Sequence, residues 1–241
     1  MHSYLRKNMP ARRMAALLAT AAIVTVTCGC GSERESRLEK EFPINEEKDA
    51  IQPERAVVQV KAGNFIGSAV LEEISEDKKT IMLLTAGHVL EHLAAGDLPT
   101  VVLEDGTEYS CDSYVRSESI DAAALFIEDE KLAEQLEQEG RFAVEDKARF
   151  DSLKDGDICI AIGAADGGEK SVCTGEILDS WIYMEDYSQY MIWAEVEMHP
   201  GMSGGGLFDG EGYFLGILSG GSEDGQAAIV PFSLILSEFH N

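Results

Sequence analysis

The chain has 241 residues, and its 44 Asp and Glu outnumber its 19 Lys and Arg to give a formal net charge of −25 at pH 7. Nucleic acids and anionic lipid surfaces are therefore disfavoured as partners, because a strongly acidic protein repels their negative charge. Cationic peptides would be attracted at low salt, although solubility alone is a sufficient explanation of the charge.

The first 30 residues have the pattern of a targeting segment. Basic residues precede an uncharged, mostly apolar stretch from Met14 to Thr27, which is shorter than the ~20 residues that span a bilayer. The small residues around Cys28 and Cys30 resemble the end of a bacterial lipoprotein signal. We therefore expect residues 1–30 to be a signal peptide, with Cys30 lipidated and the folded part extracytoplasmic, anchored to the bacterial cell membrane. Thr27 stands where Leu or Val is usual, so lipidation at Cys28, an uncleaved anchor, or cleavage and secretion stay open.

Residues 31–52 are dense in charge and poor in aliphatic side chains, which indicates a solvated tether. The remainder, 53–241, consists of short apolar or alternating stretches separated by turn residues, the pattern of β-strands. Twelve strands are expected, near residues 55–61, 64–74, 79–85, 100–103, 107–115, 120–127, 157–163, 171–183, 190–198, 204–208, 213–219 and 226–231.

Two sets of six strands predict an all-β fold of two six-stranded Greek-key β-barrels, with the active site between them. The first barrel is expected at about 53–140 and the second at about 150–231. A charged helix is expected at Asp129–Gln138, and an apolar tail predicts a short C-terminal helix at 232–239. No repeat or second domain is expected.

His88 and Asp121 are the first candidates for chemistry. His88 follows the apolar run Ile81–Leu84, which predicts a buried strand, and opens a short turn or helix. Asp121 interrupts an otherwise apolar strand, where a carboxylate is costly unless a partner such as a histidine N–H bonds to it. Taken singly, a solvent-exposed histidine and a charge at a strand edge explain them equally well.

Ser203 lies in the stretch Gly201-Met202-Ser203-Gly204-Gly205. Glycines on both sides allow a tight turn with unusual backbone angles. In such a turn the N–H groups of Gly201 and Ser203 can converge on one point, the geometry of an oxyanion hole. The order His88, Asp121, Ser203 along the chain makes a coincidence of all three improbable.

Six motifs in one order carry a resemblance to a known family: LTAGHV, DAAALFI, GDICIAIG, SVCTGEIL, HPGMSGGGLF and GILSGG. From about residue 55 to 231 the chain resembles the trypsin-like serine proteases of the chymotrypsin fold, particularly the bacterial Deg-type branch without a PDZ domain. The resemblance implies a serine endopeptidase that acts on protein or peptide substrates through an acyl-enzyme and needs no cofactor or metal. It implies His88 as general base, Asp121 as its orienting carboxylate and Ser203 as nucleophile.

The same resemblance indicates where a substrate would bind. It implies that Ser219, Gly220 and Gly221 form a strand edge that pairs with substrate backbone, with glycines that leave the specificity pocket open. It places Glu197 near the floor of that pocket, which would favour Lys or Arg before the cut. The alternative is that Glu195 and Glu197 lie on one exposed strand face.

Two residues depart from the family pattern. Met202 stands where animal digestive relatives carry an Asp that pairs with a newly cut N-terminus, so activation by such a cut is not expected. Gly206 stands where proline is usual, which predicts a change in the local backbone.

Three other functions fit parts of the same sequence. His88 to His92 matches the zinc motif H-x-x-E-H, although the candidate helix is short. The G-x-S-x-G pattern around Ser203 also occurs in α/β-hydrolases, but a strand and turn follow it, and His240 is the only later histidine. A third alternative is a binding module with the same fold and no catalytic activity.

The cysteines of the folded part are Cys111, Cys159 and Cys173, an odd number. Cys159 and Cys173 fall on two strands joined by a glycine-rich loop, so a cross-strand disulfide and free buried thiols are both compatible with the sequence.

Overall fold

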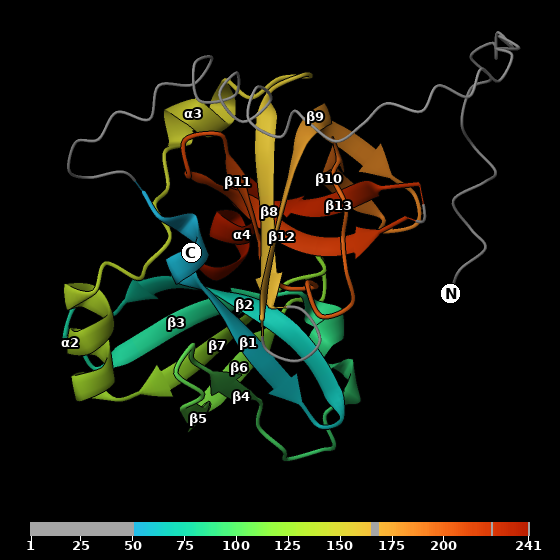
Figure 1. The fold of residues 1–241 in the computed structure, drawn as a ribbon. Coiled ribbons are helices and arrows are strands. Elements are labelled where there is room, and N and C mark those ends of the chain that lie inside the picture. The colour runs from blue at the N-terminus through green and yellow to red at the C-terminus, as the bar shows by residue number, and fades with distance from the viewer. Residues whose placement is uncertain (1–50, 165–168, 223, 241) are drawn as a thin grey trace, which may run out of the picture. The chain divides into compact units, whose positions relative to one another are not determined.

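The computed structural model describes residues 51–164, 169–222 and 224–240, so the expected signal peptide, Cys30 and nearly all of the tether lie outside it. Antiparallel strands dominate the described residues and form two sheets that follow one another along the chain (Figure 1). The expected all-β fold class is confirmed. Within these three stretches, no helix is both long enough and apolar enough to cross a membrane.

The first sheet has seven strands in the order β5-β4-β1-β2-β3-β7-β6. Its strands are β1 (Val57–Ala62), β2 (Phe65–Ile74), β3 (Thr80–Thr85), β4 (Thr100–Val102), β5 (Glu108–Ser110), β6 (Ser113–Arg116) and β7 (Ala123–Glu128). The sequence predicts one strand at 107–115, whereas the structure divides it into β5 and β6. The division occurs because the Cys111 N–H bonds to the carbonyl of Pro99 and the Asp112 N–H bonds to that of Phe126, so the chain changes its partner strand there.

The second sheet is a closed six-stranded barrel, as predicted, with the order β10-β13-β12-β11-β8-β9. Its strands are β8 (Ile158–Ala164), β9 (Lys170–Met184), β10 (Gln189–Glu195), β11 (Gly206–Asp209), β12 (Phe214–Gly221) and β13 (Gln226–Pro231). Closure leaves the barrel strands without a free edge along most of their length, and it encloses an apolar core that includes Ile192, Leu207 and Leu218.

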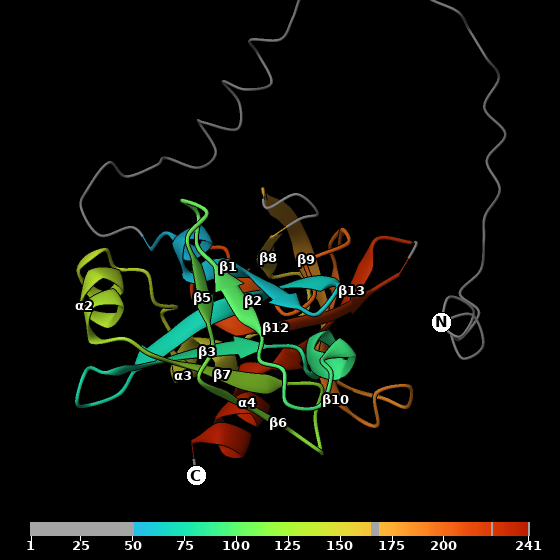
Figure 2. The ribbon, with the colours of Figure 1, turned by 90° about the horizontal axis from the view of Figure 1, so that it is seen from below.

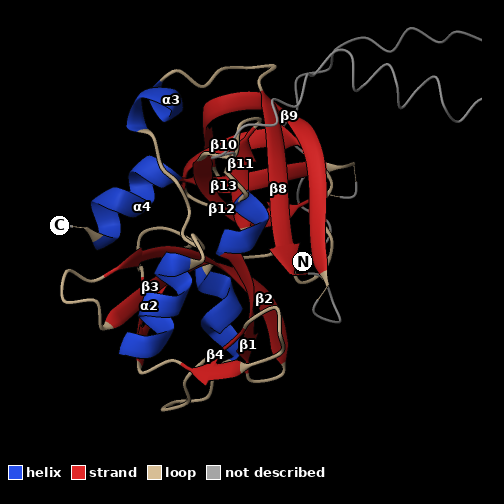
Figure 3. Ribbon diagram, turned by 60° about the vertical axis from the view of Figure 1, so that its left-hand side comes forward, coloured by secondary structure: helices blue, strands red, loops and turns tan. Residues whose placement is uncertain are grey.

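Helices lie at the periphery of the two sheets (Figure 3). Helix α2 (Glu130–Gln138) begins where the Asp129 side chain accepts hydrogen bonds from the backbone N–H groups of Lys131 and Leu132. The other helical segments are η1 (Pro53–Ala56), η2 (Gly87–His92), α3 (Lys147–Asp151) and α4 (Phe232–Phe239). The expected C-terminal helix is α4, which contacts β12 and β13 and leads to the C-terminal end of the chain (Figure 2).

The two sheets share one apolar core. A single cluster of buried side chains includes Val70 and Leu84 of the first sheet together with Ile162, Phe208 and Ile217 of the barrel. This shared burial fixes the end of β3 against the segment that precedes β11. Those two segments carry His88 and Ser203.

Candidate active site

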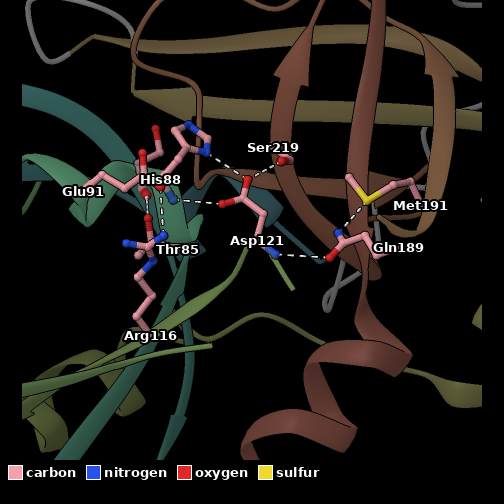
Figure 4. Close-up of polar contacts among 9 residues, drawn as sticks. Thr85, His88, Glu91, Arg116, Asp121, Gln189, Met191 and Ser219 are labelled. Atoms are coloured by element: carbon pink, nitrogen blue, oxygen red, sulfur yellow. Dashed lines mark hydrogen bonds and ion pairs between the residues drawn. The ribbon is translucent and has the colours of Figure 1, made fainter. Parts of the chain in front are cut away.

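His88 and Asp121 form a pair joined by two hydrogen bonds (Figure 4). The ring Nδ1 of His88 lies 2.8 Å from Asp121 Oδ2, and the backbone N–H of His88 donates to Asp121 Oδ1 at 2.8 Å. Gly87 allows this approach, since a Cβ at that position would lie 3.2 Å from Asp121 Oδ1. The carboxylate therefore fixes both the orientation of the ring and the tautomer with a proton on Nδ1.

Asp121 also receives support from the barrel. The hydroxyl of Ser219 on β12 donates to Asp121 Oδ2, and the backbone N–H of Asp121 donates to Gln189 Oε1 at 3.2 Å. Burial alone would raise the pKa of Asp121, but the hydrogen bonds from His88 and Ser219 and the charge of His88 hold it below its ordinary value. The site therefore keeps an ionised carboxylate that is 80% covered, because the Asp121 side chain is only 20% exposed.

The Ser203 turn has the geometry that its glycines suggest. Pro200 and Gly201 occupy the centre of a β-turn in which the Met202 N–H bonds to the carbonyl of His199 at 3.1 Å, and Gly201 has φ +94°. Proline followed by a residue with positive φ is the pattern of a type II turn. Within the described part of the chain, the N–H groups of Gly201 and Ser203 have no acceptor, so both remain available to an oxyanion.

Ser68 on β2 joins this turn to the first sheet. Its backbone N–H donates to the carbonyl of Ser203 at 2.8 Å, and its hydroxyl donates to the carbonyl of Gly201 at 2.7 Å. The same hydroxyl accepts from the Ala164 N–H at 2.7 Å, and the Ser68 carbonyl accepts from the Thr85 hydroxyl at 2.6 Å. Ser68 is fully buried, so every one of these contacts replaces a lost contact with water.

The serine turn therefore lies against the segment that carries His88. A Cβ on Gly204 would lie 2.2 Å from the Thr85 hydroxyl and 3.0 Å from the Ala86 nitrogen. Among the described residues, the hydroxyl of Ser203 makes no hydrogen bond to the His88 ring. Such bonds are commonly long without substrate and tighten when it binds.

The two positions that depart from the family pattern, Met202 and Gly206, are both closely packed. The Met202 side chain is fully buried in the barrel core, and its sulfur accepts the His199 N–H at 3.2 Å. A buried apolar side chain, that of Met202, thus stands at the position where the animal digestive proteases are expected to have an Asp. At Gly206 a Cβ would lie 2.5 Å from the ring of Phe208, so this ring fills the space that a proline would need.

The expected substrate edge is free on one side. Gly220 and Gly221 pair with β13, whereas on the other side of β12 the backbone hydrogen bonds between described residues end at Leu218, which bonds to Gly204 and Gly205. An extended peptide could therefore add along this edge. The spaces beside the two glycines are filled rather than open, since a Cβ on Gly220 would lie 2.3 Å from the Tyr187 hydroxyl, and one on Gly221 would lie 2.9 Å from Cβ of Met198.

Glu197, expected near the floor of the specificity pocket, has an exposed side chain. Glu195 and Glu197 are both exposed, while Val196 between them is buried. This alternation is that of a strand with one solvent-facing side. It corresponds to the second interpretation given above, and it gives no basis for a preference for Lys or Arg.

The residues of the H-x-x-E-H motif do not have the helix geometry that the zinc interpretation requires. They form the 3₁₀ helix η2, in which positions four apart are turned by about 120° from one another and do not share a face. Asp121 holds Nδ1 of His88, and Glu91 pairs with Arg116. No metal-ligand cluster in the described part of the chain contains both His88 and His92.

Cys111, Cys159 and Cys173 are free thiols. Cys159 lies opposite Gly175 and Cys173 opposite Ala161, so the two cysteines are not direct neighbours across the β8–β9 pair. Burial raises the pKa of Cys159 to about 12, which makes it an inert apolar side chain.

Sequence reasoning missed Ser68 and Gln189, and it placed Ser219 at the substrate edge without the contact of its hydroxyl with Asp121. The hydroxyl of Ser68, the amide of Gln189 and the hydroxyl of Ser219 all lie on strands that read as ordinary apolar or alternating segments. Gln189 and Ser219 are buried polar residues, but burial is not visible in the sequence. A small polar residue between Gly67 and the short apolar run Ala69–Leu71 is the only local signal at Ser68.

Comparison with known proteins gives a consistent result. The profile of a trypsin-like peptidase domain matches residues 67–217. The solved structure of the HtrA-type protease AlgW with a tripeptide has a TM-score of 0.62 and 26% identity over 76% of this chain. This chain spans 58% of the length of that protein.

Two less similar structures share the fold. The Rv3671c protease in its inactive form has a TM-score of 0.59 and 18% identity, covering 78% of this chain and 89% of that one. The serine endoprotease from Yersinia pestis has a TM-score of 0.60 and 21% identity, covering 76% of this chain and 61% of that one. No curated protein sequence matches the chain.

Replacement of Ser68 by Ala tests its role in joining the two sheets. The change leaves the Gly201 carbonyl and the Ala164 N–H without the hydroxyl, at a cost of about 1–3 kcal/mol for each buried polar group. Urea unfolding should show a loss of this size, whereas the exposed control Ser113→Ala on β6 should change stability by less than about 0.5 kcal/mol. Equal stability of the two variants would contradict the role of Ser68.

Proposed function

The chain belongs to the trypsin-like peptidase family, and we propose that it is an extracytoplasmic serine endopeptidase that hydrolyses peptide bonds through an acyl-enzyme. The observation that carries the proposal is the buried Asp121 carboxylate, which accepts from His88 and Ser219 at once. A carboxylate placed in this way stabilises the imidazolium that forms when His88 takes a proton.

In the proposed reaction Ser203 attacks the peptide carbonyl while the free ring nitrogen of His88 takes its proton. Asp121 keeps the proton on Nδ1, so that Nε2 is the basic atom. The backbone N–H groups of Gly201 and Ser203 then stabilise the oxyanion that develops on the substrate. His88 returns the proton to the leaving amine, and water hydrolyses the ester in a second round.

The proposed substrates are proteins or peptides in extended conformation. The one-sided pairing of Ser219–Gly221 offers main-chain groups to such a substrate. The structure of AlgW with a tripeptide supports a peptide ligand for this fold. Recognition by main chain leaves selectivity to the few side chains beside the edge, of which Tyr187 approaches Gly220 most closely.

The proposed location follows from the N-terminal segment. A basic stretch, an apolar stretch and Cys30 suggest export and a lipid anchor, and the charged residues 31–52 suggest a tether between anchor and protease. The alternative function, a silent binding module, has the same location and fold. Reactivity of Ser203 separates the two.

Labelling with a fluorophosphonate probe tests whether Ser203 is a nucleophile. The wild-type protein should react, because His88 activates the hydroxyl, and Ser203→Ala should lose all labelling together with about 10⁴-fold or more of peptidase activity. The control Ser113→Ala, on the exposed side of β6, should label like the wild type. Wild-type protein that takes up no probe between pH 6 and 9 would favour the binding module.

Cleavage of a peptide library tests Tyr187 as a determinant of selectivity. Tyr187→Ala empties the space beside Gly220, so larger substrate side chains should be accepted there, with a change in relative kcat/KM of about tenfold. Tyr183→Ala removes an exposed tyrosine from β9 of the same hairpin and is the matched control, expected to leave the profile unchanged. Identical profiles for both variants would exclude Tyr187 from the substrate site.

Metabolic labelling with a palmitate analogue in a bacterial host tests the anchor. The full chain should incorporate the lipid and sediment with membranes, and Cys30→Ser should abolish both, because the thiol is the acceptor. Cys28→Ser serves as the matched control two residues away and should still be labelled. Loss of label only in the Cys28 variant would move the anchor to that residue.

A further inference from the structure

A second polar cluster lies away from the candidate active site, around the buried carboxyl group of Glu72 on β2. The side chain of Glu72 is only 4% exposed, and its Oε1 lies 3.2 Å from Nε2 of His240 at the end of α4. Its other oxygen, Oε2, is buried and has no hydrogen-bond partner in the described residues. A carboxylate in this position is costly unless a further group satisfies it.

A β-bulge directs two successive glutamates to this cluster. Leu71 pairs with Leu83 and Glu73 pairs with Met82, so Glu72 is the extra residue with no partner on β3. In a regular strand successive side chains point to opposite faces, whereas a bulge can bring two of them to the same side. Ligand atoms of Glu72, Glu73 and His240 consequently lie within 4.8 Å of one another.

Glu145 adds a third carboxyl group from the segment between α2 and α3. Its Oε1 is also buried without a donor among the described residues. The carboxyl groups of Glu145 and Glu72 are close enough to hydrogen-bond to each other only when one of them carries a proton, and two carboxylates cannot satisfy each other. Burial is the main reason why the pKa of Glu72 rises to about 8 and that of Glu145 to about 7. In the described residues, the charged groups that act on Glu72 are Glu73, Glu145 and His240, so three carboxyl groups face one imidazole.

We propose that Glu72, Glu73 and His240 bind a zinc ion. Glu145 is not a ligand in this proposal, but its carboxyl group lies next to that of Glu72 and positions it. Imidazole nitrogen with carboxylate oxygens is a donor set that Zn²⁺ accepts, at about 2.1 Å for each ligand. Two ligands at that distance from a tetrahedral ion are about 3.4 Å apart. The 3.2 Å between His240 Nε2 and Glu72 Oε1 is close to this separation. The proposal does not depend on the proposed peptidase activity.

The ion would connect the end of α4 to the first sheet. Glu238, two residues before His240, accepts hydrogen bonds from the hydroxyls of Ser117 and Ser119 at 2.6 and 2.9 Å. Those serines begin the turn that leads to Asp121. Zinc at His240 would thus hold the helix that supports this turn.

Calorimetric titration of the purified, chelator-treated full chain with Zn²⁺ at pH 7.5 tests the site. One ion should bind per chain and raise the Tm, since a ligand that binds only the folded state stabilises it. Glu72→Gln and His240→Ala should each weaken binding at least tenfold and abolish the shift in Tm. Ca²⁺ and Mg²⁺ should bind more weakly, because the imidazole favours zinc.

The matched controls are His199→Ala and Glu76→Gln, which change exposed residues of the same types elsewhere and should leave zinc binding intact. His88→Ala tests for binding at the candidate active site and should also leave it intact. Absence of stoichiometric binding would overturn the proposal and indicate that Glu72 and Glu145 share a proton instead. Binding that survives Glu72→Gln but is lost in His88→Ala, or a preference for Ca²⁺ or Mg²⁺, would also overturn it.

Discussion

The constraint on which this structure depends is the docking of the Ser203 turn onto β2, and Ser68 is the residue that achieves it. Its N–H, hydroxyl and carbonyl contact Ser203, Gly201, Ala164 and Thr85 inside a fully buried environment. Each polar group is satisfied, so the contact is directional as well as apolar. Shared hydrophobic burial alone would allow the two sheets to slide by small amounts, which a reaction between groups on both sheets cannot tolerate.

Close backbone approach explains the glycines that follow. A Cβ on Gly205 would lie 2.2 Å from the carbonyl oxygen of Ile162, and one on Gly163 would lie 2.6 Å from Cα of Met202. The turn is therefore held between β8 and β2 with no room for side chains at its centre. Met202 supplies the one side chain that points inward, and its burial replaces an ion pair that would need a cut chain end.

The sequence predicts the parts of this protein that depend on local pattern. Apolar alternation located the strands, and the glycine pattern located the Ser203 turn, because backbone angles are a local property. Ser68 and Gln189 were not recognised as parts of the site, and the contact of the Ser219 hydroxyl with Asp121 was not foreseen, since their partners are distant in sequence. The division of the 107–115 segment and the bulge at Glu72 were missed for the same reason, because both depend on which strand lies alongside.

The Asp121 carboxylate accepts hydrogen bonds from both sheets, from His88 on one side and from Ser219 on the other. The backbone N–H of Asp121 also donates to Gln189 of the barrel. Partial opening of either sheet removes donors from a covered negative charge, so the arrangement cannot persist in a half-folded molecule. A damaged or incompletely folded copy would accordingly lose the proposed activity as soon as the two sheets separate.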